Sequence, residues 1–234
     1  MSDSAADAFF AAWRTYRKIV ETNYMYHREI GAHVEETLRA AFGDRGFSVL
    51  DLGCGDASNF APTLGRLAPS RYLGVDLSET ALALAAENLK ALSCPVELRR
   101  EDLLAAVGEG DESFDVIHTS FALHHLATER KAEFFRRAAR RLAPGGLLLL
   151  TDVMREEDES LPVYFERYTR WLRNDWRLLT EEEREATCAH LTANDLPETV
   201  STLAAQGRAA GLEPAPVVAF TWHKVARFTR PRAA

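Results

Sequence analysis

Short apolar runs alternate with segments of helical pattern through the middle of the chain. Five runs have the length and composition of strands, and they cover residues 47–52, 71–76, 95–100, 114–118 and 147–150. Between them, apolar residues recur at helical spacing, and we predict helices over residues 57–67, 78–92 and 129–142. Parallel strands need crossover connections, which helices supply. The alternation therefore predicts a mostly parallel sheet with helices on both faces.

Helical periodicity continues on both sides of this region. Before it, residues 4–41 carry two series, which are Phe9, Phe10, Trp13, Tyr16, Ile19 and Val20, then Ile30, Val34 and Leu38. After it come an apolar stripe over 161–176, a capping box that starts at Thr180, and a third helix opened by Asp195. We expect one domain made of an N-terminal helical cap (1–46), a core (47–153), a helical lid (154–212) and two closing strands (213–234).

Composition and charge narrow the class of protein. The chain has 234 residues, of which 47% are hydrophobic and 27% charged, which suits one globular domain. Its net charge of −7 argues against a nucleic-acid partner, because such proteins usually present a basic face. The one arginine cluster, Arg136, Arg137, Arg140 and Arg141, is interpreted as the solvated face of a helix. No apolar run approaches transmembrane length, so no membrane partner is expected.

The cysteines indicate a reducing compartment. Cys54, Cys94 and Cys188 are far apart and lack C-x-x-C spacing, so neither a disulfide framework nor a zinc site is expected. The N-terminus lacks a basic segment followed by an apolar run, and we expect a cytoplasmic protein. Nor does the chain contain H-E-x-x-H or another familiar ligand spacing, so we expect no metal.

A glycine turn follows the first predicted strand. Gly53 and Gly55 break the run that ends at Asp51-Leu52, and a helix is expected from Ala57 onward. Glycines let the backbone pass close to a ligand, and a helix N-terminus attracts polar groups. The NAD fingerprint would need a third glycine at Ser58, which argues against a nucleotide-dependent oxidoreductase. The structural alternative is an ordinary strand-to-helix turn.

Polar side chains follow every predicted strand of the core. They are Asp51, Asp76, Asp102, Ser120, His124 and Asp152. In a doubly wound fold the ligand lies outside the carboxyl ends of the strands, so these groups should converge. Asp76 lies where such a fold places the carboxylate that holds a ribose diol. For Asp102 a helix N-cap is the alternative.

Several of these stretches resemble one family. The pattern Asp51-x-Gly53-x-Gly55-x-Ala57 resembles motif I of the class I S-adenosylmethionine (SAM) methyltransferases, with Ala57 in place of the third glycine. "FDVIHTSFALHHL" and "RLAPGGLLLLTDV" are similar to later motifs of that family at the right spacing. The resemblance covers residues 47–153 and the tail. It implies a doubly wound, mostly parallel seven-stranded sheet whose last strand is antiparallel. We predict the last two strands over residues 216–220 and 222–228.

The resemblance also implies roles for residues. SAM is the expected cofactor and S-adenosylhomocysteine the product. Its expected site comprises Asp51, Gly53, Cys54, Gly55, Asp76, Leu77, Asp102, Leu103, Ser120 and Tyr26. His124 would remove a proton from the acceptor with support from Asp152, or would only cap a helix. His125 is expected to pack or cap, and His118 to be structural.

The lid is expected to choose the acceptor. Tyr164, Tyr168 and Trp171 would enclose a small molecule, or would simply pack the lid onto the body. Polar aromatics before residue 28, among them Tyr16, Tyr26 and His27, would form a flap over the same site, or would be core. The expected reaction is methyl transfer to oxygen or nitrogen of a small molecule. A SAM-binding protein with other chemistry, or a non-catalytic partner, is the alternative. A homodimer is left open.

Overall fold

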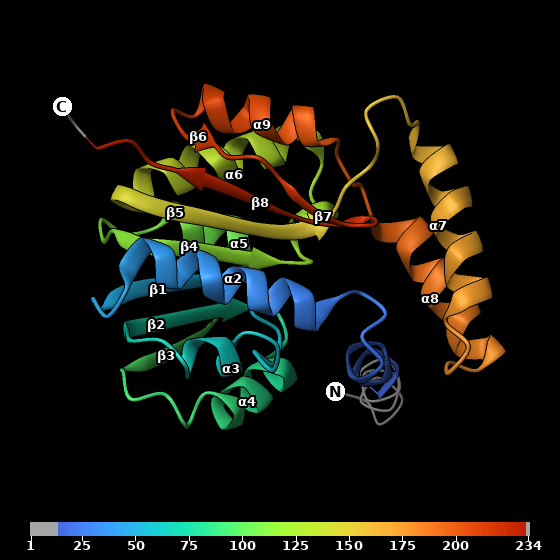
Figure 1. The fold of residues 1–234 in the computed structure, drawn as a ribbon, viewed down its shortest axis with the longest axis horizontal. Coiled ribbons are helices and arrows are strands. Elements are labelled where there is room, and N and C mark those ends of the chain that lie inside the picture. Colours follow the sequence, from blue (N-terminus) through green and yellow to red (C-terminus); the bar gives the residue numbers. More distant parts are fainter. Residues whose placement is uncertain (1–13, 233–234) are drawn as a thin grey trace.

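The computed structural model describes residues 14–232, and the strands of this part form one twisted sheet of eight (Figure 1). The strands are β1 Phe47–Leu52, β2 Pro69–Asp76, β3 Val96–Arg100, β4 Phe114–Ser120, β5 Leu142–Val153, β6 Glu213–Pro214, β7 Val218–Phe220 and β8 His223–Thr229. The helices, besides a helical stretch over 14–21, are α2 His27–Phe42, α3 Ala61–Leu64, α4 Glu79–Asn88, α5 Leu103–Gly108, the 3₁₀ turn η1 Leu123–His125, α6 Thr128–Arg141, α7 Leu161–Asp175, α8 Glu181–Asn194 and α9 Val200–Ala209. Phe9, Phe10 and Trp13 of the predicted first helical series lie outside the described residues.

The sheet has the order β3-β2-β1-β4-β5-β8-β6. The first five strands are parallel, whereas β8 runs antiparallel to β5. This confirms the predicted mostly parallel sheet with an antiparallel end. The outer edge of β8 pairs with two short strands, β6 and β7, so eight strands fill the seven expected positions. The strand order reverses between β1 and β4, and a crevice at that point is where ligands bind in doubly wound folds.

Alternating residues of β1 supply both hydrophobic cores. Leu50 and Leu52 face a cluster formed with α5, α6 and α9. Phe47 and Val49 face a second cluster formed with α2, α3 and α4. Successive strand side chains point to opposite faces, so one buried strand serves both layers. The N-terminal helix α2 packs across this face of the sheet (Figure 1).

The glycine turn is longer than expected and the helix after it shorter. Gly53, Gly55 and Ala57 have φ of 70°, 55° and 56°, outside the right-handed helical region. The predicted helix start at residue 57 is therefore wrong, and α3 covers only Ala61–Leu64. Backbone amides of the turn, rather than a helix N-terminus, face the carboxyl edge of the sheet.

The start of α9 also differs from the prediction. Thr199 caps that helix by accepting a hydrogen bond from the Thr202 amide, so it begins at Val200. Asp195 instead ends α8. The capping box at the start of α8 is confirmed, since Thr180 and Glu183 exchange both expected hydrogen bonds.

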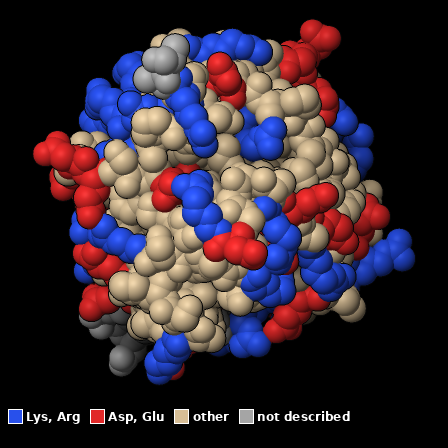
Figure 2. Space-filling view, turned by 60° about the vertical axis from the view of Figure 1, so that its left-hand side comes forward, with Lys and Arg blue, Asp and Glu red and all other residues tan. Residues whose placement is uncertain are grey.

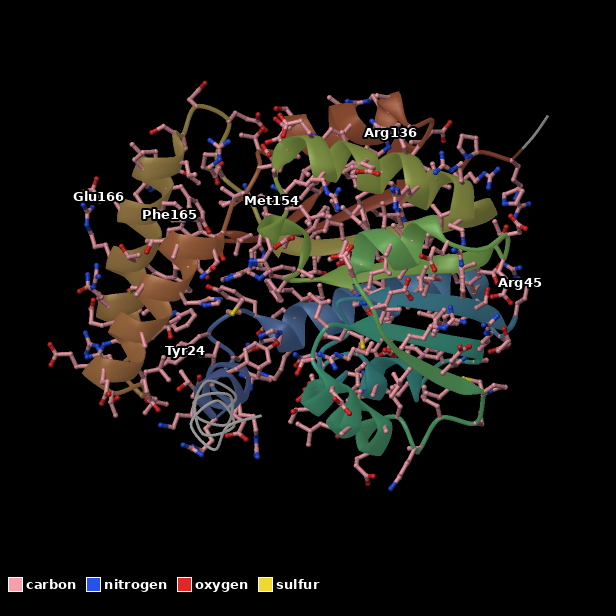
Figure 3. The ribbon with its side chains drawn as sticks, turned by 180° about the vertical axis from the view of Figure 1, so that it is seen from behind. Tyr24, Arg45, Arg136, Met154, Phe165 and Glu166 are labelled. Atoms are coloured by element: carbon pink, nitrogen blue, oxygen red, sulfur yellow. The ribbon has the colours of Figure 1, made fainter. Side chains whose placement is uncertain are left out.

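The helices α7 and α8 pair at one end of the sheet, and Arg45 marks the opposite end (Figure 3). They are held there by aromatic packing. Tyr24 stacks on Trp176, with ring centroids 5.1 Å apart. Trp171 lies 4.8 Å from Trp222, which precedes β8. The residues after the fifth strand thus form a helical unit docked on the N-terminal segment and on β8.

Two arginines of the predicted solvated cluster have structural roles. Arg137 donates to the Leu104 carbonyl at 2.7 Å, and buried Arg141 donates to the Glu112 carbonyl at 2.7 Å. They tie α6 to α5 and to the turn before β4, so only Arg136 and Arg140 are exposed as predicted. On the face shown in Figure 2, basic and acidic side chains are interspersed. No helix within residues 14–232 is long and apolar enough to cross a membrane.

Candidate active site

A cavity of about 600 Å³ opens at the carboxyl ends of β1, β2 and β4. Nine of the ten residues predicted for the cofactor site line it, namely Asp51, Gly53, Cys54, Gly55, Asp76, Leu77, Asp102, Leu103 and Ser120. These residues come from four separate stretches of sequence. Their convergence follows from the parallel strands, which bring all four strand ends to one edge.

Gly53 and Gly55 shape the floor of the cavity. A Cβ on Gly53 would lie 2.6 Å from the Cβ of Ala122, so the loop after β4 can approach only because Gly53 has no side chain. The Gly53 and Cys54 amides both donate to the Val75 carbonyl, at 2.8 and 3.0 Å. These bonds hold the turn against the end of β2.

Asp76 joins this turn to the next helix. Its Oδ2 accepts from the Gly55 amide at 2.9 Å, and its Oδ1 accepts from the Ser78 amide at 2.8 Å. The carboxylate is therefore fixed at the strand end, and each oxygen retains a lone pair for a ligand. The neighbouring Leu77 side chain is 65% exposed at the rim of the cavity.

Asp102 caps a helix and also lines the cavity. Its Oδ1 caps α5 by accepting from the Leu104 and Ala105 amides, at 2.9 and 3.1 Å. The N-cap interpretation is thus correct. The residue also lines the cavity, and no donor among residues 14–232 bonds its Oδ2.

Asp51 is the centre of a buried polar cluster. Tyr72 donates to its Oδ2 at 2.6 Å, and His118 Nδ1 lies 2.7 Å from its Oδ1. Burial, and then the Asp51 carboxylate, raise the pKa of Tyr72 well above its ordinary value. His118, interpreted from sequence as structural, lines the cavity and stacks on Phe60 at 4.0 Å between centroids. The pairing of β1 with β4 places Asp51 opposite His118. This pairing was not used in the sequence prediction, which is why the contact between the two residues was missed.

The N-terminal segment covers the same cavity. Tyr16 and His27 line it, which agrees with the predicted flap. Burial lowers the pKa of His27 to about 4, and its Nε2 has no hydrogen-bond partner among the described residues. Thr151 Oγ1 also lies at the cavity and likewise has no hydrogen-bond partner among the described residues. Such buried unpaired atoms at a cavity wall are where a ligand can bond.

Tyr26, predicted in the cofactor site, lies outside the cavity. Its φ of 59° turns the chain at the start of α2. Its ring stacks on Phe220, and its hydroxyl lies 3.3 Å from Thr221 Oγ1. Its place in the wall is taken by the next residue, His27.

His124 and Asp152 lie together, but neither lines the cavity. His124 Nδ1 is 2.5 Å from Asp152 Oδ1, and the His124 amide donates to Oδ2 at 3.0 Å. Burial lowers the His124 pKa, but the Asp152 and Asp195 carboxylates outweigh this effect and raise it overall. His124 Nε2 faces Asp195, while His125 lines the cavity. The base role of His124 stays a prediction. In this structure its ring faces Asp195 and does not line the cavity.

The three predicted acceptor residues of the lid also lie outside the cavity. Tyr164 and Tyr168 are buried, and Tyr168 Oη lies 2.9 Å from His223 Nε2. Trp171 packs on Trp222. The apolar surfaces of these three side chains already pack against β8 and against one another. This agrees with the alternative in which they simply pack the lid onto the body. Contact with an acceptor stays a prediction that this arrangement does not support.

Comparisons with known proteins agree with this geometry. Residues 49–146 match the model of the methyltransferase domain family. A ribosomal protein L11 methyltransferase of Thermosipho africanus is 32% identical over 158 residues, which are 64% of this chain and 55% of that protein. A ubiquinone biosynthesis O-methyltransferase of a Chelativorans species is 29% identical over 144 residues, 61% of this chain and 55% of that protein. The chain thus spans about half the length of these relatives.

A solved structure extends the match to almost the whole chain. Magnesium protoporphyrin IX methyltransferase of Synechocystis, solved with bound S-adenosylhomocysteine, superposes with a TM-score of 0.65 at 16% identity. The superposition covers 95% of this chain and 94% of that one, and at this identity it shows a shared fold. Fold, family match and the order of the motifs agree. Residues 49–146 thus match a methyltransferase domain, and the described chain has the class I methyltransferase fold, for which S-adenosylmethionine is the cofactor.

Proposed function

We propose that this protein transfers a methyl group from SAM to an oxygen or nitrogen atom of a small molecule. The observation that carries the proposal is one cavity in which the glycine turn and the strand-end carboxylates face the buried polar atoms of the N-terminal flap. Its volume of about 600 Å³ lies in the range of small-molecule sites.

The two carboxylates support one orientation of the cofactor. Asp76, fixed by two amides, would accept hydrogen bonds from the ribose hydroxyls. The uncommitted Oδ2 of Asp102 would bond the adenine amino group, with Leu77 and Leu103 against the ring. The methionine portion would then lie over Gly53 and Gly55, next to Asp51.

The acceptor would occupy the remaining space between the flap and the end of β4. That wall is mainly apolar, with Ile30, Val34 and Phe121, and carries the unpaired His27 Nε2. The sulfonium is already activated, so the protein's main task is to position the acceptor. His27, neutral near pH 7 because burial lowers its pKa to about 4, can accept a hydrogen bond from an acceptor hydroxyl or amine.

The test separates binding from transfer and small acceptors from large ones. Calorimetric titration should give saturable binding of SAM and none of NAD. Protein incubated with SAM labelled in its methyl group should transfer label to the small-molecule fraction of a cell extract. Label confined to the protein or nucleic-acid fraction would overturn the proposed acceptor class. Binding of SAM without any transfer would favour the non-catalytic alternative.

A further inference from the structure

Three potential metal ligands meet where η1 touches the end of α8. His124 Nε2 lies 3.5 Å from Asp195 Oδ1, and His125 Nδ1 lies 3.6 Å from the same oxygen. All three ligand atoms are within 4.8 Å of one another. A tetrahedral ion with ligand distances of about 2.0–2.2 Å separates its ligands by roughly 3.3–3.6 Å. The two separations measured to the carboxylate oxygen fit that geometry.

The shared carboxylate oxygen gives a second, independent indication of a ligand. Asp195 Oδ1 is buried and has no hydrogen-bond partner among the described residues. A buried carboxylate oxygen without a partner is costly, and buried charges are normally paired or bound to metal. Both imidazole nitrogens face it at ion-pair distance without hydrogen-bond geometry, and His125 Nδ1 also lies 3.4 Å from the Asn194 carbonyl oxygen.

His124 is held in the orientation that a metal ligand requires. Asp152 Oδ1 is 2.5 Å from Nδ1, which fixes the ring and leaves Nε2 as the atom facing Asp195. A carboxylate behind a histidine is the usual outer support of a metal-bound imidazole. Asp152 itself is fixed by the backbone amides of His124 and Val153.

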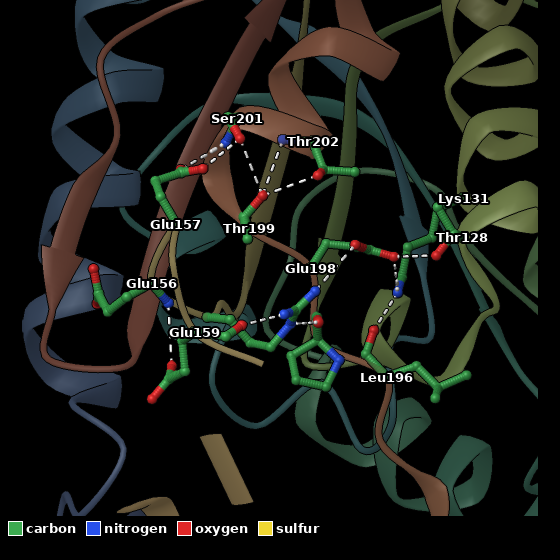
Figure 4. Close-up of polar contacts among 12 residues, drawn as sticks. Thr128, Lys131, Glu156, Glu157, Glu159, Leu196, Glu198, Thr199, Ser201 and Thr202 are labelled. Carbon is green, nitrogen blue, oxygen red and sulfur yellow. Dashed lines mark hydrogen bonds and ion pairs between the residues drawn. The ribbon is translucent and has the colours of Figure 1, made fainter. Parts of the chain in front are cut away.

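The segment after Asp195 is held by hydrogen bonds to three neighbouring segments. The Leu196 amide donates to the His124 carbonyl at 2.7 Å. Buried Lys131 of α6 donates to the Leu196 carbonyl, and Arg155 donates to the Pro197 carbonyl at 2.8 Å (Figure 4). Asp195 is therefore held in position against η1.

We propose that His124, His125 and Asp195 bind one divalent transition-metal ion of the zinc class, with Asp152 as the supporting carboxylate. Two imidazole nitrogens and one carboxylate oxygen suit zinc or cobalt better than magnesium, which prefers oxygen ligands. The ion would join the loop after β4 to the end of α8. Since His125 lines the cavity, the ion would lie beside the proposed active site. These ligands form no familiar sequence spacing, since Asp195 is 70 residues from His125 in the chain, and no metal was expected from the sequence.

The experiment uses the full chain without an affinity tag and measures metal alone, in the absence of SAM and acceptor. Titration with Co²⁺ should produce one equivalent of visible absorption bands typical of four-coordinate cobalt, and Zn²⁺ should displace it. Competition with a chromophoric chelator gives the zinc affinity, which Asp195→Asn and His125→Ala should each lower by roughly a hundredfold. Asp152→Asn should lower it by about 10–100-fold. Circular dichroism in excess chelator checks that each variant is folded.

The matched control is His190→Ala, because His190 is next to His125 with ring centroids 6.3 Å apart but lies outside the ligand set. It should bind zinc like the unmodified chain. Equal zinc affinity in the unmodified protein and Asp195→Asn would overturn the site, as would the absence of cobalt bands. A loss of binding in His190→Ala, with binding retained in His125→Ala, would overturn the assignment of ligands. A failure of SAM binding leaves these readouts unaffected, so the proposed function fails or stands separately.

Discussion

Asp76 Oδ2 accepts a hydrogen bond of 2.9 Å from the amide of Gly55, twenty-one residues earlier in the chain. The carboxylate at the end of β2 and the glycine turn after β1 therefore form one unit. The second carboxylate oxygen is bound to the Ser78 amide. A ligand that bonds Asp76 meets a group whose position has been fixed before binding, which lowers the entropic cost of association.

Asp76→Ala should weaken SAM binding by roughly 10–100-fold, because it removes charge-assisted hydrogen bonds worth about 1.5–3 kcal/mol. Calorimetric titration with SAM measures the effect. Asp44→Ala is the control, since Asp44 is exposed in the turn before β1. Equal SAM affinity in folded Asp76→Ala protein would show that the ribose is held elsewhere.

Gly53→Ala and Gly43→Ala separate a close approach from backbone strain. Both glycines have positive φ, 70° and 58°, but a Cβ would lie 2.6 Å from Ala122 at Gly53 and meets nothing within 4 Å at Gly43. Strain alone should cost Gly43→Ala about 1–2 kcal/mol of unfolding free energy. Gly53→Ala should lose a further ~1–3 kcal/mol from overpacking, together with SAM affinity. Urea unfolding measures the stability loss of both variants. Equal losses would mean that the loop after β4 moves away freely from the added Cβ.

His27 should make the protein less stable in mild acid. Burial lowers its folded-state pKa from 6.5 to about 4, so between these pH values the unfolded chain binds more protons than the folded one. The contribution of His27 to the free energy of unfolding is fully present above pH 6.5. It falls by about 3 kcal/mol as the pH drops to 4. Buried His223, with a pKa lowered to about 3, acts in the same direction.

Denaturant unfolding of His27→Asn across this pH range isolates the first of these two histidines. The slope of unfolding free energy against pH should be smaller than in the unmodified protein. An identical slope in His27→Asn would assign the acid sensitivity to other groups.

Tyr168→Phe tests whether the lid aromatics pack or bind. The hydroxyl lies 2.9 Å from buried His223 Nε2, so its removal should cost about 1–2 kcal/mol by leaving that nitrogen unpaired. SAM affinity should not change. Tyr164→Phe is the matched control, because Tyr164 stacks on Tyr168 but makes no described hydrogen bond through its hydroxyl. Loss of acceptor binding in Tyr168→Phe without loss of stability would restore the acceptor role.

The sequence by itself determined the strands and the chemistry at their ends. The short apolar runs, the glycine turn and the N-cap signal at Asp102 are local, and local backbone energetics decides them. Parallel pairing then places Asp51, Asp76 and Asp102 at one edge whatever the details of packing. For this reason nine of the ten residues predicted for the cofactor site line one cavity, and the core of the sheet was predicted with them.

Tertiary structure decided which buried side chains face the cavity. Tyr26 and His27 are adjacent polar aromatic residues, and the sequence pattern does not distinguish them. The left-handed backbone at Tyr26 is what directs His27 to the cavity wall. The lid stripe was visible as an amphipathic pattern, but the partner that covers it lies 55 residues beyond Tyr168 at His223. Asp195 likewise meets His124 only because α8 returns to η1. Periodicity states that a face is buried, whereas contacts distant in the chain decide what it is buried against.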